Sequence, residues 1–368
     1  MRHLPAEWEP QQAVMLTWPH AGTDWAAQLD AVEAVYRRLV QLIIRDQAVL
    51  IVCRDEAHRR AIQAQLSEPA AGAEASAKGQ SERIRFAVAP SNDTWARDHG
   101  PISVIDRATN ARILIDFRFN GWGGKYPAEL DDRITARVYA AASERERLEP
   151  SPLVLEGGAI ESDGAGSLLA VRRTLVDPKR NPDWSQAAIE AELRDRLGVE
   201  RILWLEHGQL SGDDTDGHID TLARFCDSQT LCYAASTNPE DSDHPALEQL
   251  AAELRALRQR NGAPYRLIAL PQPAPIHDEH GQRLPAGYAN FLITNRAVLV
   301  PVYDDPADAI ACERLAACFP GRRIEPVDCR PLIRQGGSLH CITMQLAASA
   351  QRLNSVIMCS TEQASNAA

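Results

Sequence analysis

The 368-residue sequence has no apolar run long enough to span a lipid bilayer, so we expect no transmembrane helix. The opening stretch Met1–Trp8 also lacks the apolar core of a secretory signal. Both observations favour a cytoplasmic protein that does not contact a membrane.

Nucleotide-binding and cysteine-pair motifs are missing as well. No Gly-x-Gly-x-x-Gly segment follows a strand pattern and no P-loop occurs, which disfavours a nucleotide-dependent enzyme. None of the eight cysteines forms a Cys-x-x-Cys pair, which disfavours a zinc knuckle or a thioredoxin-type site. We expect free thiols, and five of them lie in apolar or helical surroundings typical of packing residues: Cys226, Cys232, Cys312, Cys318 and Cys329.

The charge balance is acidic, with a formal net charge of -11 from 39 basic and 50 acidic residues. An acidic protein repels nucleic acid and attracts small cations, so we expect a cationic small substrate and no nucleic-acid partner. Apolar residues make up 45% of the chain, which is enough for a large folded core.

Strand-like and helix-like segments alternate along the whole chain, which predicts an α/β fold with internal repetition. We count about five strand–helix–strand units. The expected strands are Ala13–Trp18, Ala48–Cys53, Ile84–Val88, Arg112–Phe119, Leu153–Leu155, Ser167–Val171, Thr230–Ala234 and Ala297–Val302. The expected helices are Asp24–Ile44, Ala128–Ala142, Trp184–Leu197, Pro245–Arg260 and Pro306–Phe319.

Two polar clusters follow expected strands, where functional loops concentrate. Asn92–Pro101 contains Asp98 and comes directly after one strand, although Asn and Asp also form ordinary capped turns and Arg97 can pair with Asp98 at a surface. Leu155–Gly158 places Glu156 before two glycines, which either presents a carboxylate at a strand end or marks a solvated turn.

The third cluster, Ser211–Asp220, holds four carboxylates and one histidine within eight residues. In an extended segment His218 and Asp220 would point to the same face, which places an acid–base group beside a carboxylate. A divalent-metal site built from His218, Asp213, Asp216 and Asp220 is the alternative, because His and Asp are good metal ligands. An acidic solvated loop is the third interpretation.

The fourth cluster is Gly336–Thr343, in which Cys341 lies between a glycine-rich turn and a β-prone segment. A cysteine there is a candidate nucleophile if a histidine and carboxylates accompany it, and otherwise a buried packing residue. His340 would point away from Cys341 in a strand, so His218 is the better candidate for the catalytic base.

Taken together, the segments resemble the agmatine deiminase family, also called the bacterial-type peptidyl-arginine deiminase family, of the guanidine-modifying (pentein) superfamily. The resemblance extends over nearly the whole chain. The matching segments are Pro5–Pro10, Thr17–Pro19, Asn92–Asp98, Phe119–Tyr126, Leu155–Gly158, Asp213–Asp220 and Gly336–Thr343.

The resemblance implies a five-bladed α/β propeller of ββαβ units and a hydrolase that needs neither a metal nor another cofactor. It assigns Cys341 as the nucleophile and His218 as the general acid/base. It further implies that Asp98 and Asp220 hold the guanidinium group and that Glu156 accompanies the histidine and the guanidinium. The family also implies a homodimer or a larger homo-oligomer.

The expected substrate is agmatine, whose amine suits the acidic residues near His218, among them Asp214. Trp95 and Trp122 either line the channel around the alkyl chain or belong to the ordinary core. Peptidyl-arginine is the alternative substrate, and a metal-dependent hydrolase and a non-catalytic guanidine- or polyamine-binding protein are the other classes. We expect one catalytic domain over residues 1–355, with a surface insertion near 67–80 and a C-terminal tail at 356–368.

Overall fold

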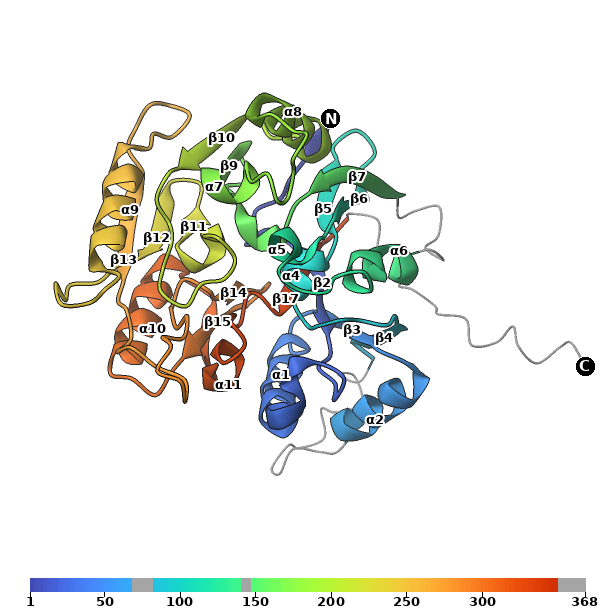
Figure 1. The fold of residues 1–368 in the computed structure, drawn as a ribbon. Coiled ribbons are helices and arrows are strands. Elements are labelled where there is room, and N and C mark those ends of the chain that lie inside the picture. Colours follow the sequence, from blue (N-terminus) through green and yellow to red (C-terminus); the bar gives the residue numbers. More distant parts are fainter. Residues whose placement is uncertain (68–81, 140–146, 350–368) are drawn as a thin grey trace, which may run out of the picture.

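A three-strand unit recurs throughout the computed structural model, which describes residues 1–67, 82–139 and 147–349 (Figure 1). The described residues form five small mixed sheets, and in each the second strand of the unit pairs antiparallel with the first and parallel with the third. A helix connects the second strand to the third. The predicted α/β class and the count of about five units are confirmed.

The strands of the five sheets are as follows. One sheet has the order β17 (Thr343–Ala347), β2 (Gln11–Thr17), β3 (Ala48–Cys53) and β4 (Ile84–Val88). The next has the order β1 (Arg2–His3), β5 (Ile102–Asp106), β6 (Ala111–Arg118) and β7 (Arg147–Val154). The remaining three are β8 (Ile160–Ser162), β9 (Ser167–Val171) and β10 (Arg201–Leu205); β11 (Ala223–Asp227), β12 (Thr230–Ala234) and β13 (Arg266–Leu270); and β14 (Leu292–Ile293), β15 (Ala297–Val302) and β16 (Arg323–Asp328).

Helices connect these strands and cover the outside of the sheets (Figure 1). The longer ones are α1 (Leu29–Ile43), α2 (Glu56–Ser67), α6 (Ile134–Tyr139), α8 (Gln186–Leu197), α9 (His244–Ala256) and α10 (Ala307–Cys318). Short turns of helix are η1 (Asp24–Gln28), α4 (Ala96–His99), α5 (Gly121–Gly124), η2 (Asp131–Arg133), η3 (Gly157–Ala159), α7 (Arg172–Leu175), η4 (Ile219–Thr221) and α11 (Arg330–Ile333).

The sequence pattern explains the main elements. Strand β3 is an unbroken apolar run because it lies in mid-sheet, parallel to both neighbours, and five of its six residues are buried. Helix α1 buries Val32, Tyr36, Leu39 and Ile43, spaced three to four residues apart, as expected for a helix with one face against the core.

Several predicted boundaries differ from the structure. The expected helix Asp24–Ile44 is divided into η1 and α1. The expected strand Leu153–Leu155 is the end of the longer β7, whose Pro150 and Pro152 hid the strand pattern. The end of the expected helix Ala128–Ala142, the insertion near 67–80 beyond Ser67 and the tail at 356–368 lie outside the described residues.

Strand β17 joins the last described part of the chain to its beginning. It pairs antiparallel with β2, with Thr343 opposite Leu16 and Met344 opposite Met15. Segments near both ends of the sequence therefore complete one sheet, which places the segment before β17 near the centre of the molecule beside α4 (Figure 1).

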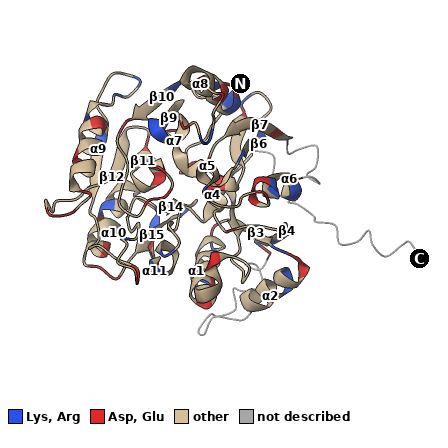
Figure 2. Ribbon diagram, viewed as in Figure 1, with Lys and Arg blue, Asp and Glu red and all other residues tan. Residues whose placement is uncertain are grey.

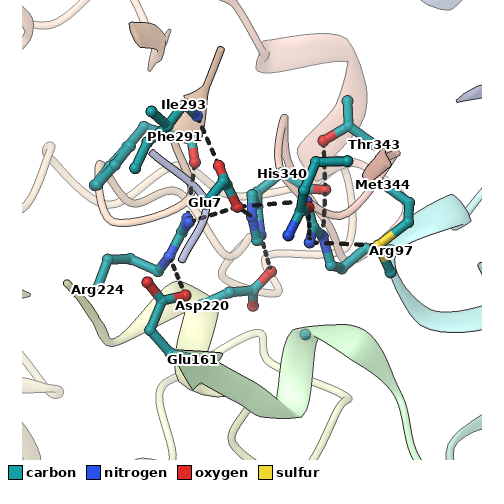
Figure 3. A network of polar contacts seen from close by, with 12 residues as sticks. Glu7, Arg97, Glu161, Asp220, Arg224, Phe291, Ile293, His340, Thr343 and Met344 are labelled. Atoms are coloured by element: carbon teal, nitrogen blue, oxygen red, sulfur yellow. Dashed lines mark hydrogen bonds and ion pairs between the residues drawn. The ribbon is translucent and has the colours of Figure 1, made fainter. Parts of the chain in front are cut away.

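Charged residues lie both on the surface and in the interior. Residues of both signs occur on outer helices such as α2 (Figure 2). Inside the molecule, the fully buried Arg224 donates to Glu161 at 2.7 Å and to Glu7 at 2.9 Å (Figure 3). This cation holds together β8, β11 and the N-terminal segment. No helix among the described residues is long and apolar enough to cross a membrane.

Replacing the buried cation should destabilise the fold. Arg224→Met leaves two buried carboxylates without their partner, so the free energy of unfolding should fall by about 3–5 kcal/mol. Urea denaturation measures the loss. The control is Arg59→Met, which removes an exposed pair with Glu56 and should cost less than about 1 kcal/mol. Equal losses in both variants would contradict a structural role for the Arg224 pairs.

Candidate active site

Polar residues recur at one position of the structural repeat, the turn that leads into the first strand of each unit. Asp98 lies in α4 before β5, and Glu156 precedes η3 and β8. The other turns contribute His218 and Asp220 before β11, Asn290 before β14 and Cys341 before β17. All six residues are buried. The fold therefore brings at least one polar side chain from each of the five units to a common centre.

Asp98 is held by two uncharged donors. The backbone N–H of Gly158 donates to Oδ1 at 3.1 Å, and the indole N–H of Trp122 donates to Oδ2 at 3.0 Å. Burial, with Asp220 and Glu156 nearby, raises the pKa of Asp98 to about 6 despite the opposing effect of His218. Arg97 does not pair with Asp98 as a surface pair would; it is buried and contacts Gln345 at 2.6 Å.

Gly158 explains why glycine follows Glu156. A Cβ atom on Gly158 would lie 2.5 Å from Nδ1 of His218 and 2.9 Å from Oδ1 of Asp98. A side chain would therefore push apart the histidine and the carboxylate. The glycines of the Leu155–Gly158 cluster allow a close approach and do not mark a solvated turn.

His218 lies between two carboxylates. Its Nδ1 is 3.7 Å from Oδ1 of Asp98 and its Nε2 is 3.6 Å from Oε2 of Glu156. Burial lowers the pKa of His218, but Asp98 and Glu156 outweigh burial and raise it to about 9. The expected extended segment is wrong: His218 caps the short helix η4, and this turn brings Asp220 close enough to support the imidazolium.

Arg180 is a site residue that the sequence did not reveal. Its Nε donates to both oxygens of Glu156 at 2.8 and 2.9 Å, and its Nη1 donates to Asp216 at 2.9 Å. These bonds tie Glu156 to the loop that carries His218. Although burial alone raises the pKa of Glu156, His218 and Arg180 lower it, so the carboxylate stays charged. Nothing in the polar segment around Arg180 distinguishes it from a surface loop.

Cys341 is in contact with an amide and a carboxylate. Its Sγ is 3.3 Å from Nδ2 of Asn290 and 3.9 Å from Oδ2 of Asp220. Asn290 has a fixed orientation because its Oδ1 accepts the backbone N–H of His340 at 2.8 Å. Burial, Asp220 and Asp98 raise the pKa of the Cys341 thiol well above its usual range. In the empty site the cysteine is therefore a thiol.

Asn290 could have been found from the repeat. It stands two residues before β14, in the position that Cys341 occupies before β17. Strand β14 has only two residues, so the sequence pattern showed the later strand and the helix of this unit but not its first strand. The segment 339–342 is a turn and not a strand, and the ring of His340 extends from it to Asp220.

A cavity of about 710 Å³ leads to Cys341. Asp98, Trp95, Trp122, Tyr126 and Asp214 are among the residues that line it. Both tryptophans are almost fully buried and also border the cavity, so they belong to the packed core and line the cavity at the same time. Tyr126 donates its hydroxyl to Oδ2 of Asp214 at 2.9 Å.

The four residues of the alternative metal set have other partners. Asp216 pairs with Lys125 at 2.8 Å and with Arg180, and Asp213 accepts the backbone N–H groups of Thr215 and Gly217. Within the described parts of the chain, no group of three or more His, Cys, Asp or Glu residues has the arrangement of a metal site. The acidic loop is thus organised by cations and backbone donors of the protein itself.

Comparisons with known proteins show the family to which the chain belongs. The model of the Porphyromonas-type peptidyl-arginine deiminase family matches residues 3–347. The agmatine deiminase of Pseudomonas aeruginosa is 32% identical over 370 residues, which cover 94% of this chain and 95% of that protein. That of Stutzerimonas stutzeri is 31% identical over 367 residues, with 94% and 95% covered.

Solved structures give the same result. A cysteine-to-serine variant of the C. jejuni agmatine deiminase with substrate bound has a TM-score of 0.84 at 32% identity, covering 95% of this chain and 97% of that chain. A Porphyromonas gingivalis protein provisionally named an arginine deiminase has a TM-score of 0.86 at 45% identity, covering 95% and 99%. The fold and these relatives define a hydrolase of the deiminase class. The chain belongs to the Porphyromonas-type peptidyl-arginine deiminase family.

The charge of His218 should appear in the pH dependence of stability. Its folded-state pKa of about 9 lies above the ordinary 6.5, so its stabilising effect is complete below pH 6.5 and is lost as the pH rises through 9. His218→Asn should therefore cost more free energy of unfolding at about pH 6 than at about pH 10. Urea denaturation at both pH values measures the difference.

His99 provides a control of opposite sign. Burial lowers its pKa to about 3, so the folded protein holds it neutral, and its contribution falls when the pH drops below 6.5. His99→Asn should cost less at about pH 6 than at about pH 10. The same pH trend in both variants would show that His218 is not held as an imidazolium.

Proposed function

We propose that the protein hydrolyses agmatine to N-carbamoylputrescine and ammonia through a covalent amidino-cysteine intermediate. The observation that carries the proposal is a nucleophile between two incompletely paired carboxylates. Among the described residues, Asp98 accepts hydrogen bonds only from neutral groups, and the buried Oδ1 of Asp220 has no hydrogen-bond partner. A buried carboxylate in this state is stabilised by a cation that also donates hydrogen bonds.

A guanidinium group meets this requirement. It is planar, always charged, and offers five donors in a fixed fork, so two carboxylates can grip it through paired hydrogen bonds. Asp98 and Asp220 hold it, and Cys341 lies beside Asp220 for attack on the central carbon. Orientation of this kind supplies a large part of the barrier reduction.

Substrate binding also activates the nucleophile. Asp98 and Asp220 disfavour a thiolate in the empty site, and a bound guanidinium compensates their charge. The amide of Asn290 then donates a hydrogen bond to the sulfur. The thiolate therefore forms only when the carbon that it attacks is in place; the thiol proton passes to solvent and is regained after the product leaves.

The reaction proceeds in two stages. The Cys341 thiolate bonds to the guanidinium carbon, and the His218 imidazolium gives its proton to the departing nitrogen, so that ammonia leaves. The remaining adduct joins the carbon to sulfur. Neutral His218 then takes a proton from water, the hydroxide attacks the same carbon, and the C–S bond breaks. The ureido product is released, and the one proton left over is taken up by ammonia.

We prefer agmatine over peptidyl-arginine as the substrate because the residues at the far end of the cavity suit a methylene chain that ends in an amine. Trp95 and Trp122 provide flat apolar walls for the methylene chain, and Asp214 provides an acceptor for the terminal amine. Peptidyl-arginine, which the family description names, is the second candidate. The same five-sheet frame supports the interpretation of the fold as a five-bladed propeller with the site on its axis.

Ammonia release on agmatine, arginine and a peptidyl-arginine substrate, measured side by side, tests the proposal. Agmatine should give the highest kcat/KM. A chelator should leave the rate unchanged, since the proposed steps use only protein side chains. Activity that disappears with the chelator and returns with added metal would favour the metal-dependent hydrolase instead.

The nucleophile can be tested directly. Cys341→Ala should lower turnover by at least about 1,000-fold and abolish the covalent adduct detected by mass spectrometry, because no other group can form the C–S bond. Cys312→Ala, in helix α10 away from the cavity lining, is the matched control and should retain activity. Turnover by Cys341→Ala within about tenfold of wild type would exclude Cys341 as the nucleophile.

The role of Asp214 can be separated from general effects on the site. Asp214→Asn removes a charged acceptor, so KM for agmatine should rise by roughly 10-fold or more. The control substrate is butylguanidine, which lacks the terminal amine and should be nearly unaffected. Equal losses on both substrates would mean that Asp214 supports the loop and does not receive the amine.

A further inference from the structure

The ring of His340 lies between two buried carboxylates (Figure 3). Its Nδ1 is 2.7 Å from Oδ2 of Asp220, and its Nε2 is 2.7 Å from Oε2 of Glu7. The three side chains are almost completely buried, at 1%, 0% and 4% exposure for His340, Asp220 and Glu7. Water therefore cannot mediate or screen these contacts.

With both carboxylates charged, these distances fit a hydrogen on each ring nitrogen. A neutral imidazole has one N–H donor and one lone pair, so one of the two contacts would set a lone pair against a carboxylate oxygen. A protonated carboxyl group would relieve this conflict. However, both carboxyl groups have a lowered pKa, although burial alone would raise it. Arg224 and His340 lower the pKa of Glu7, and His340 and His218 lower that of Asp220.

The groups facing His340 act in both directions. Burial and the guanidinium groups of Arg224 and Arg97 lower the pKa of His340, and the opposing effect of Glu7 and Asp220 does not reverse this net lowering. The charged form is therefore supported by the contact geometry. Arg224 pairs with Glu161 and Glu7, whereas Arg97 donates to Gln345 through Nη1 and its Nη2 lies 3.7 Å from Oε2 of Glu7. The two short contacts on opposite sides of the ring favour the charged form.

Asp220 gains a fixed orientation from this contact. One of its oxygens, Oδ2, is bound to His340, while Oδ1 remains buried with no hydrogen-bond partner among the described residues. Glu7 anchors the other side of the ring, because its Oε1 accepts the backbone N–H of Ile293 at 2.7 Å and its Oε2 accepts Arg224. The contacts from Glu7 through His340 to Asp220 thus connect the N-terminal segment to a carboxylate that we propose binds the substrate.

We propose that His340 is a positioning residue, an imidazolium held between Glu7 and Asp220 that keeps Asp220 charged and leaves its Oδ1 free for the guanidinium. The role of Asp220 in this statement depends on the proposed function. The charge and the geometry of His340 do not, and they can be tested without a substrate.

A neutron crystal structure of the wild-type protein tests the charge. It should show hydrogen isotope on both ring nitrogens of His340. His99 is the internal control, because burial lowers its pKa to about 3 and it should carry one hydrogen. A single hydrogen on His340 would overturn the proposal, whatever the substrate of the enzyme.

A double-mutant cycle tests the action through Asp220. In a Cys341→Ser background, calorimetry gives the Kd of agmatine for the parent, His340→Gln, Asp220→Asn and the combined variant. His340→Gln should weaken binding by about 10-fold or more, and adding it to Asp220→Asn should weaken binding little further, because coupled residues are not additive. Additive losses would show that His340 does not act through Asp220.

Glu7→Gln provides a second variant if His340→Gln does not fold. It removes the charge of one of the two groups that face the imidazolium and should show the same non-additive effect with Asp220→Asn. Failure of the proposed function is distinguishable: the Cys341→Ser parent would then not bind agmatine at all, and the neutron result would still decide the charge of His340.

Discussion

Burying carboxylates costs free energy unless each has a charged or donor partner, and the centre of this molecule follows that constraint. Arg224 forms ion pairs with Glu7 and Glu161, and Arg180 forms an ion pair with Glu156. Asp98, by contrast, accepts hydrogen bonds from an indole and a backbone N–H, with the His218 ring 3.7 Å away. This less completely paired carboxylate lines the same cavity as Cys341, where we propose that the guanidinium group binds.

The repeated unit explains how distant residues meet. Each unit places a short turn before its first strand, and the turns of the five units converge at one centre (Figure 1). The strands supply stability and the turns supply chemistry. Turns can vary without disturbing the sheets, so one unit can contribute a cysteine, another an amide and others carboxylates.

Much of this was visible in the sequence. The predicted strand Ala48–Cys53 has the same bounds in the structure. A strand buried on both faces has apolar residues at every position, so its ends are easy to recognise in the sequence. Asp98, Glu156, His218, Asp220 and Cys341 stand in dense polar clusters. Asn290, Arg180 and the Glu7–His340 contact were not visible, because a lone amide, an arginine in a polar loop and a pair 333 residues apart acquire meaning only from tertiary contacts.

The pairing of β17 with β2 has a consequence for protein synthesis. The first strand of the core sheet lacks its antiparallel neighbour until nearly all described residues have been translated, so the nascent chain exposes an open sheet edge. Glu7 likewise lacks its contact with His340 until residue 340 has been translated. Cys341 lies in the turn directly before β17, so a partly translated chain contains the buried carboxylates and His218 before it contains this cysteine.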